Sequence, residues 1–227
     1  MIKAIIFDFD GVICESIEVK KEAFRKLFLD YPEHLEEIVD YHMANGGLSR
    51  YKKFEYIYQK ILKKDLSEEK SQELGRKFSE YGVEDVIASD FVIGAEEFLK
   101  KYSQRLSLFI ASGTPEEEMV MIAKSRRLEV FFKGVYGSPK TKSEMVRKIL
   151  TENHFKNYDV IFVGDAVNDY YGAQDNGVRF IGRLHKIYPN PFVPFGLKDT
   201  IDDLNDLESL LKHEHLLPSE YAGRENN

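Results

Sequence analysis

Short runs of apolar residues recur along the chain, separated by segments in which apolar residues have helical spacing. Four runs predict buried strands: residues 4–10 (AIIFDFD), 106–112 (LSLFIAS), 160–165 (VIFVGD) and 178–182 (VRFIG). Near-continuous apolarity is typical of strands that are covered on both faces. Helical patterns occupy residues 115–128 and 142–154 between these runs. The alternation predicts an α/β fold whose core is a Rossmann-like, doubly wound parallel sheet.

The stretch from about residue 15 to residue 90 breaks this alternation. It holds no convincing strand but four segments with helical spacing of apolar residues, at 16–31, 32–45, 49–64 and 67–82. Phe54, Ile57, Tyr58 and Ile61, for example, recur on one helix face. The pattern predicts an inserted all-helical cap domain at 15–90 and an α/β core domain made of residues 1–14 and 91–227.

The C-terminal part of the chain is poorer in long apolar runs. We expect an ordered, proline-rich loop at 188–196, a short helix at 200–211 and a frayed tail at 219–227.

Composition restricts the class of protein. The chain has 227 residues, of which 43% are hydrophobic and 31% charged, as in soluble globular proteins. Its net charge of -7 argues against binding to nucleic acid or to an anionic membrane, because both require an excess of Lys and Arg. The only cysteine, Cys14, cannot form an internal disulfide. With no signal-peptide layout and no apolar run near ~20 residues, we expect a cytoplasmic protein.

Polar residues follow the predicted strands. Asp8 and Asp10 end the first, and the segments SGT (112–114), SPKTK (138–142) and GDAVND (164–169) lie at or just past later strand ends. Because the carboxyl ends of parallel strands meet at one edge of a sheet, these loops are expected to converge.

Two carboxylates of the last segment reinforce this interpretation. Asp165 and Asp169 are four residues apart, which on a helical turn brings both to one face. Clustered carboxylates repel one another unless a cation lies among them, and an all-oxygen ligand set suits Mg²⁺. The sequence therefore predicts a divalent cation at the strand ends.

A helix start is predicted in the segment SGTPEEE. Thr114, Pro115 and Glu117 have the spacing of an N-cap, a first helical residue and a capping box. Ser112 and the amide of Gly113 precede this start, where free N–H groups and the helix dipole favour a phosphate.

Thr141 and Glu144 have the same spacing and predict a second helix start. Lys142 would lie in its first turn, where the dipole disfavours a cation by ~0.3–1 kcal/mol. A lysine placed against this preference indicates an anion nearby.

The order and spacing of these motifs resemble those of the haloacid dehalogenase superfamily of phosphotransferases over nearly the whole chain. DFDGV resembles its first motif, FIASGT its second, a lysine of SPKTK its third and GDAVNDYYGAQDNG its fourth. The helical insert between the first and second motifs resembles its helical, C1-type cap. True dehalogenases of the superfamily lack the second aspartate of DxD, so Asp10 favours phosphate esters.

The resemblance implies a role for each matched residue. Asp8 would be the nucleophile that takes the phosphoryl group, and Asp10 the general acid for the leaving oxygen and then the base for water. Ser112 and the motif lysine would hold the phosphoryl oxygens, next to Gly113 and Thr114 as substrate-binding residues. The expected Mg²⁺ ligands are Asp8, the backbone carbonyl of Asp10, and Asp165, with Asp169 in support.

The third motif fits less closely than the others. The family often has Lys directly before Pro, whereas here Ser138 precedes Pro139 and two lysines follow. We choose Lys142, at the predicted helix start, as the catalytic lysine. Lys140 remains an open alternative and is otherwise expected to bind substrate.

The loop in the predicted cap at 45–54 (NGGLSRYKKF) is the segment most relevant to substrate choice. Two glycines interrupt the bundle, and Ser49 can cap the helix that follows. In family terms such a loop faces the active site, so Arg50, Lys52 and Lys53 could contact an anionic or polyhydroxyl leaving group. A solvated basic turn is the alternative.

Together these features predict an Mg²⁺-dependent phosphatase that hydrolyses a small phosphorylated metabolite through an aspartyl phosphate. A sugar phosphomutase of the same superfamily and a non-catalytic binding protein on this scaffold are the alternatives. A phosphonate-cleaving relative would need a cap lysine for a Schiff base, for which the candidates are Lys20, Lys21, Lys52 and Lys53.

Overall fold

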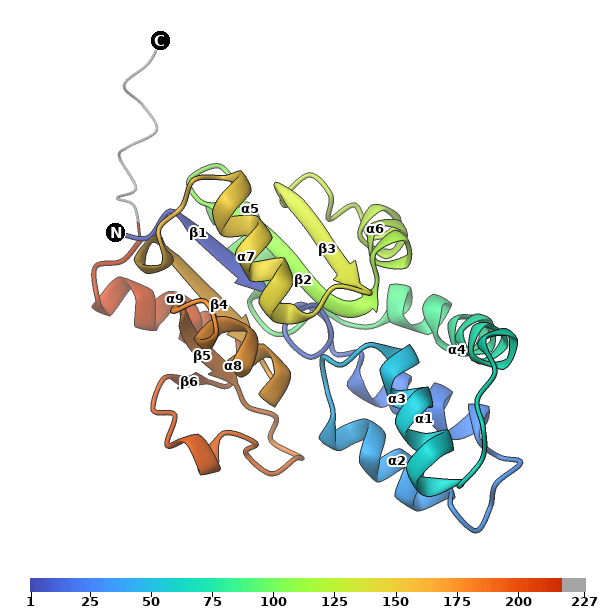
Figure 1. Ribbon diagram of the computed structural model, residues 1–227. Helices are drawn as coiled ribbons and strands as arrows, with labels where there is room; N and C mark the ends of the chain where they lie inside the picture. The colour runs from blue at the N-terminus through green and yellow to red at the C-terminus, as the bar shows by residue number, and fades with distance from the viewer. Residues whose placement is uncertain (218–227) are drawn as a thin grey trace.

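The computed structural model describes residues 1–217 and contains a six-stranded parallel sheet (Figure 1). The strands are β1 (Ala4–Phe7), β2 (Ser107–Pro115), β3 (Gly134–Ser138), β4 (Val160–Gly164), β5 (Arg179–Arg183) and β6 (Thr200–Ile201). Their order across the sheet is β3-β2-β1-β4-β5-β6, and every neighbouring pair is parallel. The chain starts at the centre and winds to both sides, so the predicted Rossmann-like α/β core is confirmed.

Helices connect the strands. They are α1 (Ile17–Leu27), α2 (Leu35–Ala44), α3 (Arg50–Tyr56), α4 (Glu68–Ala88), α5 (Ala95–Tyr102), α6 (Glu116–Ser125), α7 (Lys142–Glu152), α8 (Val167–Gln174) and α9 (Leu204–His213). A π-helical turn at Ile57–Ile61 continues α3, and short 3₁₀ turns lie at Asn157–Asp159 and Val193–Phe195.

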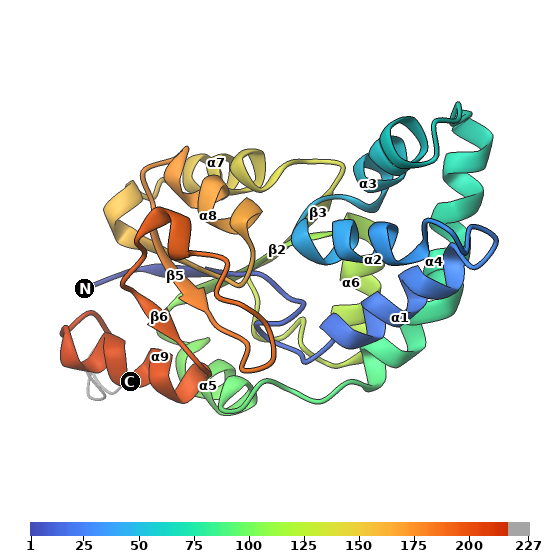
Figure 2. The ribbon, with the colours of Figure 1, turned by 90° about the horizontal axis from the view of Figure 1, so that it is seen from below.

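Alternate residues of β1 face two different cores. Ile5 and Phe7 pack with apolar side chains of α5, α6 and α9, whereas Ala4 and Ile6 pack with those of α7 and α8. Figure 2 shows α7 and α8 on one side of the sheet and α5 and α9 on the other. A strand covered on both faces has to be apolar at successive positions, which is the physical origin of the AIIF run.

Three elements of the core were not predicted. Strand β3 contains two glycines and lies at the sheet edge, where it has little apolar signal of its own. Strand β6 is only two residues long, and it occupies the start of the segment predicted as a C-terminal helix. Helix α5 did have a detectable signal, because Ala95, Phe98, Leu99 and Tyr102 recur on one buried face.

Helices α1 to α4 form a bundle beside the carboxyl end of the sheet (Figure 1). Their apolar side chains make a cluster of their own, centred on Phe24, Phe28 and Phe54 and separate from the two clusters of the sheet. The four predicted helices of this segment are confirmed, although α4 runs on to Ala88 and places Val86 in a sheet cluster. The boundaries of the cap domain at residues 15 and 90 stay a prediction.

The C-terminal part differs from its expectation at the start of the predicted helix, where β6 precedes α9. The loop at 188–196 is anchored by Phe192, whose side chain is fully buried. The tail predicted to fray, 219–227, lies outside the described residues. No helix between residues 1 and 217 is long and apolar enough to cross a membrane.

Candidate active site

The polar strand ends converge on one cavity, of about 560 Å³, between the carboxyl edge of the sheet and the helical bundle. Seven residues expected in the site from the sequence line it: Asp8, Asp10, Arg50, Lys53, Gly113, Thr114 and Asp165. Three more, Ser112, Lys142 and Asp169, are buried residues next to them. Strands β1, β2 and β4 are adjacent in the sheet, and this adjacency brings their separate loops together.

Lys142 joins two of the carboxylates. Its ammonium group lies 2.9 Å from Asp8 Oδ1 and 2.6 Å from Asp169 Oδ1, and it donates to the carbonyl oxygen of Ala111 at 2.7 Å. The capping box of Thr141 and Glu144 is present, which confirms the predicted helix start. The cation held there against the helix dipole is therefore balanced by two buried carboxylates.

Burial and neighbouring charges shift the pKa values of Asp8 and Lys142. Burial and, after it, the nearby Asp169 carboxylate raise the pKa of Asp8 to about 7, although Lys142 opposes the rise. For Lys142, burial acts to lower the pKa, but Asp169 and Asp8 outweigh it and raise the pKa above its ordinary value. Lys142 is consequently a permanent cation at neutral pH, and the protonation of Asp8 is sensitive to any further charge brought close to it.

Three carboxylates form a group able to hold a metal ion. Asp8, Asp165 and Asp169 each offer one oxygen, and these oxygens all lie within 4.8 Å of one another. Burial raises the pKa of Asp165 and that of Asp169. This is the result expected when carboxylates are packed together without enough positive charge. An all-oxygen set of buried carboxylates suits Mg²⁺, so the residues fit the expected ion.

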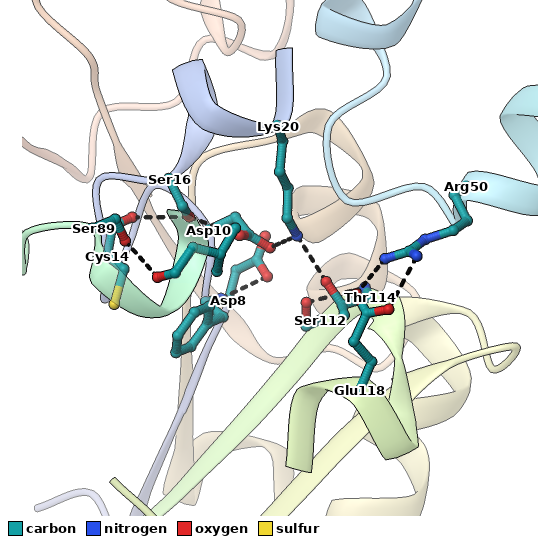
Figure 3. A network of polar contacts seen from close by, with 12 residues as sticks. Asp8, Asp10, Cys14, Ser16, Lys20, Arg50, Ser89, Ser112, Thr114 and Glu118 are labelled. Carbon is teal, nitrogen blue, oxygen red and sulfur yellow. Dashed lines mark hydrogen bonds and ion pairs between the residues drawn. The ribbon is translucent and has the colours of Figure 1, made fainter. Parts of the chain in front are cut away.

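Asp10 is held by two residues that approach from α1 and from just before it (Figure 3). Ser16 Oγ donates to Asp10 Oδ1 at 2.7 Å, and Lys20 pairs with Asp10 Oδ2. Burial by itself would raise the pKa of Asp10, but Lys20 outweighs it and the pKa lies below its ordinary value. Asp10 is therefore ionised in this conformation, and its charge is bound to the helical bundle.

The loop after β2 differs from its predicted form. Thr114 is not an N-cap, because β2 extends through Pro115 and α6 begins at Glu116 without a side-chain cap. The strand continues because Pro115 pairs with Ser138 of β3 after a register shift. The hydroxyl of Thr114 instead accepts a hydrogen bond from Lys20 at 2.7 Å, and Ser112 Oγ accepts one from the Thr114 amide at 3.1 Å.

Two glycines let the core and the bundle approach each other closely. A Cβ on Gly113 would lie 2.7 Å from the carbonyl oxygen of Gly47, and Gly47 itself has a φ of +72°. Any larger residue at position 113 would force the two loops apart, so glycine here closes one wall of the cavity.

The two lysines of the third motif have different surroundings. Lys142 points into the buried carboxylates, whereas Lys140 pairs with Glu116 at 2.9 Å and is 35% exposed. Lys140 is not among the residues that line the cavity. The structure therefore favours Lys142 as the site lysine, whereas Lys140 neither lines the cavity nor pairs with the aspartates, contrary to its expected role in substrate binding.

Arg50 lines the cavity, but its guanidinium is already engaged. It pairs with Glu118 of α6 at 2.5 Å, donates to Ser79 Oγ at 2.7 Å and lies over the ring of Phe78. Ser49 precedes it at the N-cap position of α3 but makes no side-chain cap. Arg50 thus links the bundle to the sheet, a role that its position in a basic loop did not indicate.

Several polar neighbours of the site do not follow from the motifs. Lys20 is expected from the sequence only as a candidate for Schiff-base chemistry, and Glu118 carries no signal of its role. His185, which follows β5, donates to or accepts from Asp165 at 2.8 Å through Nε2. A histidine just past a strand end at this edge of the sheet is a signal that could have been used. Lys52 is 69% exposed and pairs with Glu55, which supports the solvated interpretation for that residue.

Lys53 is the cation of the bundle whose pKa is shifted most from its ordinary value. Burial, with the positive charges of Lys20 and Arg50 adding to it, lowers the pKa of Lys53 to about 7, and the carboxylates of Asp10 and Asp8 oppose this shift only in part. The unfolded chain, with its ordinary lysine, therefore binds one more proton than the folded chain between about pH 7 and pH 10. The contribution of Lys53 to the free energy of unfolding is therefore lowest at or below pH 7, and it rises as the pH increases from about 7 to 10.

We therefore expect Lys53→Met to stabilise the protein most at pH 7, because Met removes the penalty of a buried charge. The advantage over the native protein should shrink by up to about 1.4 kcal/mol per pH unit as pH rises from 7 to 9. Urea unfolding of both proteins at pH 7, 8 and 9 measures this difference, with Lys52→Met as the exposed control. A difference that is constant with pH would contradict the assignment.

Comparison with solved structures places the fold among known ones. A predicted phosphatase from Clostridium acetobutylicum superimposes with a TM-score of 0.75 at 18% identity, covering 94% of this chain and 99% of the other. A predicted phosphoglycolate phosphatase from Haemophilus somnus gives 0.72 at 18% identity, with 92% and 97% covered. A CbbY variant from Rhodobacter sphaeroides, bound to xylulose-(1,5)bisphosphate, gives 0.70 at 18% identity, with 91% and 96% covered. At these identities the likeness concerns the fold.

Comparison by sequence identifies the family. No curated protein sequence matches the chain. The model of the haloacid dehalogenase-like hydrolase family matches residues 5–183, a span that begins in β1, includes the helical bundle and ends with β5. All of the aspartates, the serine and the lysines discussed above lie within that span. The chain therefore belongs to the haloacid dehalogenase-like hydrolases.

Proposed function

We propose that the protein is an Mg²⁺-dependent phosphatase that hydrolyses a small phosphorylated metabolite through a phosphoryl group carried by Asp8. The observation that carries the proposal is the Asp8 carboxylate, which ends the central strand, is paired with Lys142 and opens onto the cavity. A carboxylate in such a position can act as a nucleophile and divide one difficult displacement into two easier steps. The bundle at 15–90 is the proposed cap domain.

In the first step an oxygen of Asp8 forms a bond to phosphorus while the bond from phosphorus to the leaving oxygen breaks. Asp10 gives its proton to that oxygen, so the alcohol leaves neutral. In this conformation Lys20 and Ser16 keep Asp10 ionised. The acid role therefore requires that the contact between Lys20 and Asp10 be loosened when substrate binds.

In the second step water attacks phosphorus and the bond to Asp8 breaks, which releases inorganic phosphate. Asp10 takes the proton from this water, a role for which its ionised state is suited. The same residue thus acts as acid and then as base, as the two successive displacements require.

Lys142 and Ser112 are the proposed partners of the phosphoryl oxygens. Lys142 is held next to Asp8 before substrate arrives, so little reorganisation is needed when charge develops. Asp8, the carbonyl of Asp10, Asp165 and Asp169 would hold Mg²⁺, which would supply additional positive charge for the phosphoryl oxygens and would lower the pKa of Asp8.

The compared structures support a small phosphorylated substrate. One is named for phosphoglycolate and another is bound to xylulose-(1,5)bisphosphate. A cavity of about 560 Å³ has room for a phosphoryl group and a small leaving group. We also keep the expectation of a cytoplasmic location.

The proposal predicts that purified protein releases inorganic phosphate from p-nitrophenyl phosphate and from members of a panel of phosphorylated sugars, nucleotides and small acids. Release should require Mg²⁺ and stop with EDTA. Phosphate that reappears on a sugar product, with none set free, would indicate a phosphomutase instead. If no ester is turned over with Mg²⁺ present, the protein would instead be a non-catalytic binding protein on this scaffold.

A further inference from the structure

The helical bundle presents three cations to the cavity, and two of them already have carboxylate partners. Lys20 pairs with Asp10, and Arg50 pairs with Glu118 of α6 (Figure 3). The third is Lys53 of α3, which also lines the cavity and is only 5% exposed. Among residues 1–217, no carboxylate lies within 4.0 Å of the Lys53 ammonium group.

His42 of α2 is the partner that Lys53 does have. Lys53 Nζ donates to the carbonyl oxygen of His42 at 3.1 Å and lies 3.3 Å from its Nδ1. The imidazole is buried, stacks on Phe24 with ring centroids 4.0 Å apart, and has its pKa held well below the usual value by burial. A neutral imidazole whose Nδ1 accepts from Lys53 carries its proton on Nε2, which leaves that N–H free to donate.

The surroundings make an unpaired ammonium group costly. Phe24 and Phe78 line the cavity and contact the ring of His42, so the local dielectric is low. A purely structural role would be filled better by an apolar side chain, because a buried charge without a counter-ion destabilises a fold. The same low dielectric strengthens the attraction for an anion that enters the cavity.

An anion bound by Lys53 would lie at a different place in the cavity from the transferred phosphoryl group. The proposed partners of the phosphoryl group, Lys142 and Ser112, are on the sheet side of the cavity, whereas Lys53 and His42 belong to the bundle. Binding at both places at once requires two anionic groups joined by a short linker.

We propose that the leaving group of the substrate carries a second anionic group, a carboxylate or a phosphate, which binds Lys53 and the Nε2–H of His42. This inference rests on the proposed phosphatase function and specifies its substrate class. The ammonium supplies the charge, and the imidazole N–H supplies a second donor that fixes orientation.

The experiment uses ω-carboxyalkyl phosphates with one to four methylenes, each paired with the n-alkyl phosphate of equal length. Their binding to the Asp8→Asn protein with Mg²⁺ is measured by calorimetry, because this variant should bind without turnover. At one or more lengths the carboxylate ester should bind about 10-fold or more tightly than its alkyl partner. The matching alkane bisphosphates form the second arm and distinguish phosphate from carboxylate.

Adding Lys53→Met should reduce this preference to about 2-fold or less, whereas adding Lys52→Met, one residue away and exposed, should leave it unchanged. Lys53→Gln, a polar replacement, should act as Lys53→Met does and serves if the Met protein does not fold. A preference that survives both Lys53 variants, or no preference at any length in either arm, overturns the inference. Failure of the phosphatase proposal would be seen separately, as native protein that binds these esters without releasing phosphate.

Discussion

Asp8→Asn is expected to abolish turnover of every phosphate ester that the native protein hydrolyses. The amide lacks the charged oxygen that attacks phosphorus, and no other described carboxylate combines the end of β1 with contact to Lys142 at 2.9 Å. Steady-state phosphate release with Mg²⁺ is the measurement, and mass spectrometry rules out deamidation back to aspartate. The loss should exceed that of any other single substitution in the site.

Asp10→Asn is the matched control for this result. Its backbone carbonyl, the proposed metal ligand, is unchanged, so Mg²⁺ binding should be largely retained while both steps are slowed. Appreciable steady turnover by Asp8→Asn of verified mass would refute the nucleophile assignment. Equal and complete loss of Mg²⁺ affinity in both variants would show that the two aspartates do not have separate roles.

Lys142→Ala is expected to lower kcat by about 10²-fold or more, with much less effect from Lys140→Ala. Lys142 contacts the proposed nucleophile directly, whereas Lys140 pairs with Glu116 and does not line the cavity. Without Lys142, Asp8 and Asp169 lose their shared counter-ion. Affinity for beryllium fluoride, a phosphoryl mimic, should therefore fall even with Mg²⁺ present.

Measuring kcat and mimic affinity for both lysine variants tests this assignment. Thermal unfolding with Mg²⁺ shows whether Lys142→Ala remains folded, since it leaves two buried carboxylates unpaired. A large loss in Lys140→Ala with Lys142→Ala near native would reverse the assignment. No loss in either would place the third motif elsewhere in the chain.

The central sheet could be predicted because each of its inner strands carries its own signal. The AIIF run of β1 is apolar at every position since both of its faces are covered, and β2, β4 and β5 follow the same rule. Edge strands depend less on apolar burial, so β3, with its two glycines, and the short β6 left no comparable pattern. The start of α6 was misplaced because pairing between Pro115 and Ser138 prolongs β2 past a good capping sequence.

In the site, too, the residues that sequence neighbours specify could be predicted, whereas contacts between distant segments could not. Asp8, Asp165 and Lys142 could be chosen from sequence because each stands next to a strand end or a helix start that its neighbours specify. Arg50 was placed correctly at the cavity, but its partner Glu118 is 68 residues away in the chain. Lys20 likewise pairs with Asp10 and donates a hydrogen bond to Thr114. These three residues come from separate segments, which come together only when the bundle packs against the sheet.

The α/β core, the helical insert and the set of acidic and basic residues at the strand ends follow from the amino-acid sequence, because periodicity, capping and strand-end position are local properties. Which of those charges are paired depends instead on how the bundle and the sheet pack together. Lys52 and Lys53 are adjacent and chemically identical, yet one is 69% exposed beside Glu55 and the other is buried beside His42. Burial and electrostatic pairing depend on residues distant in sequence, so they arise only when the chain has folded.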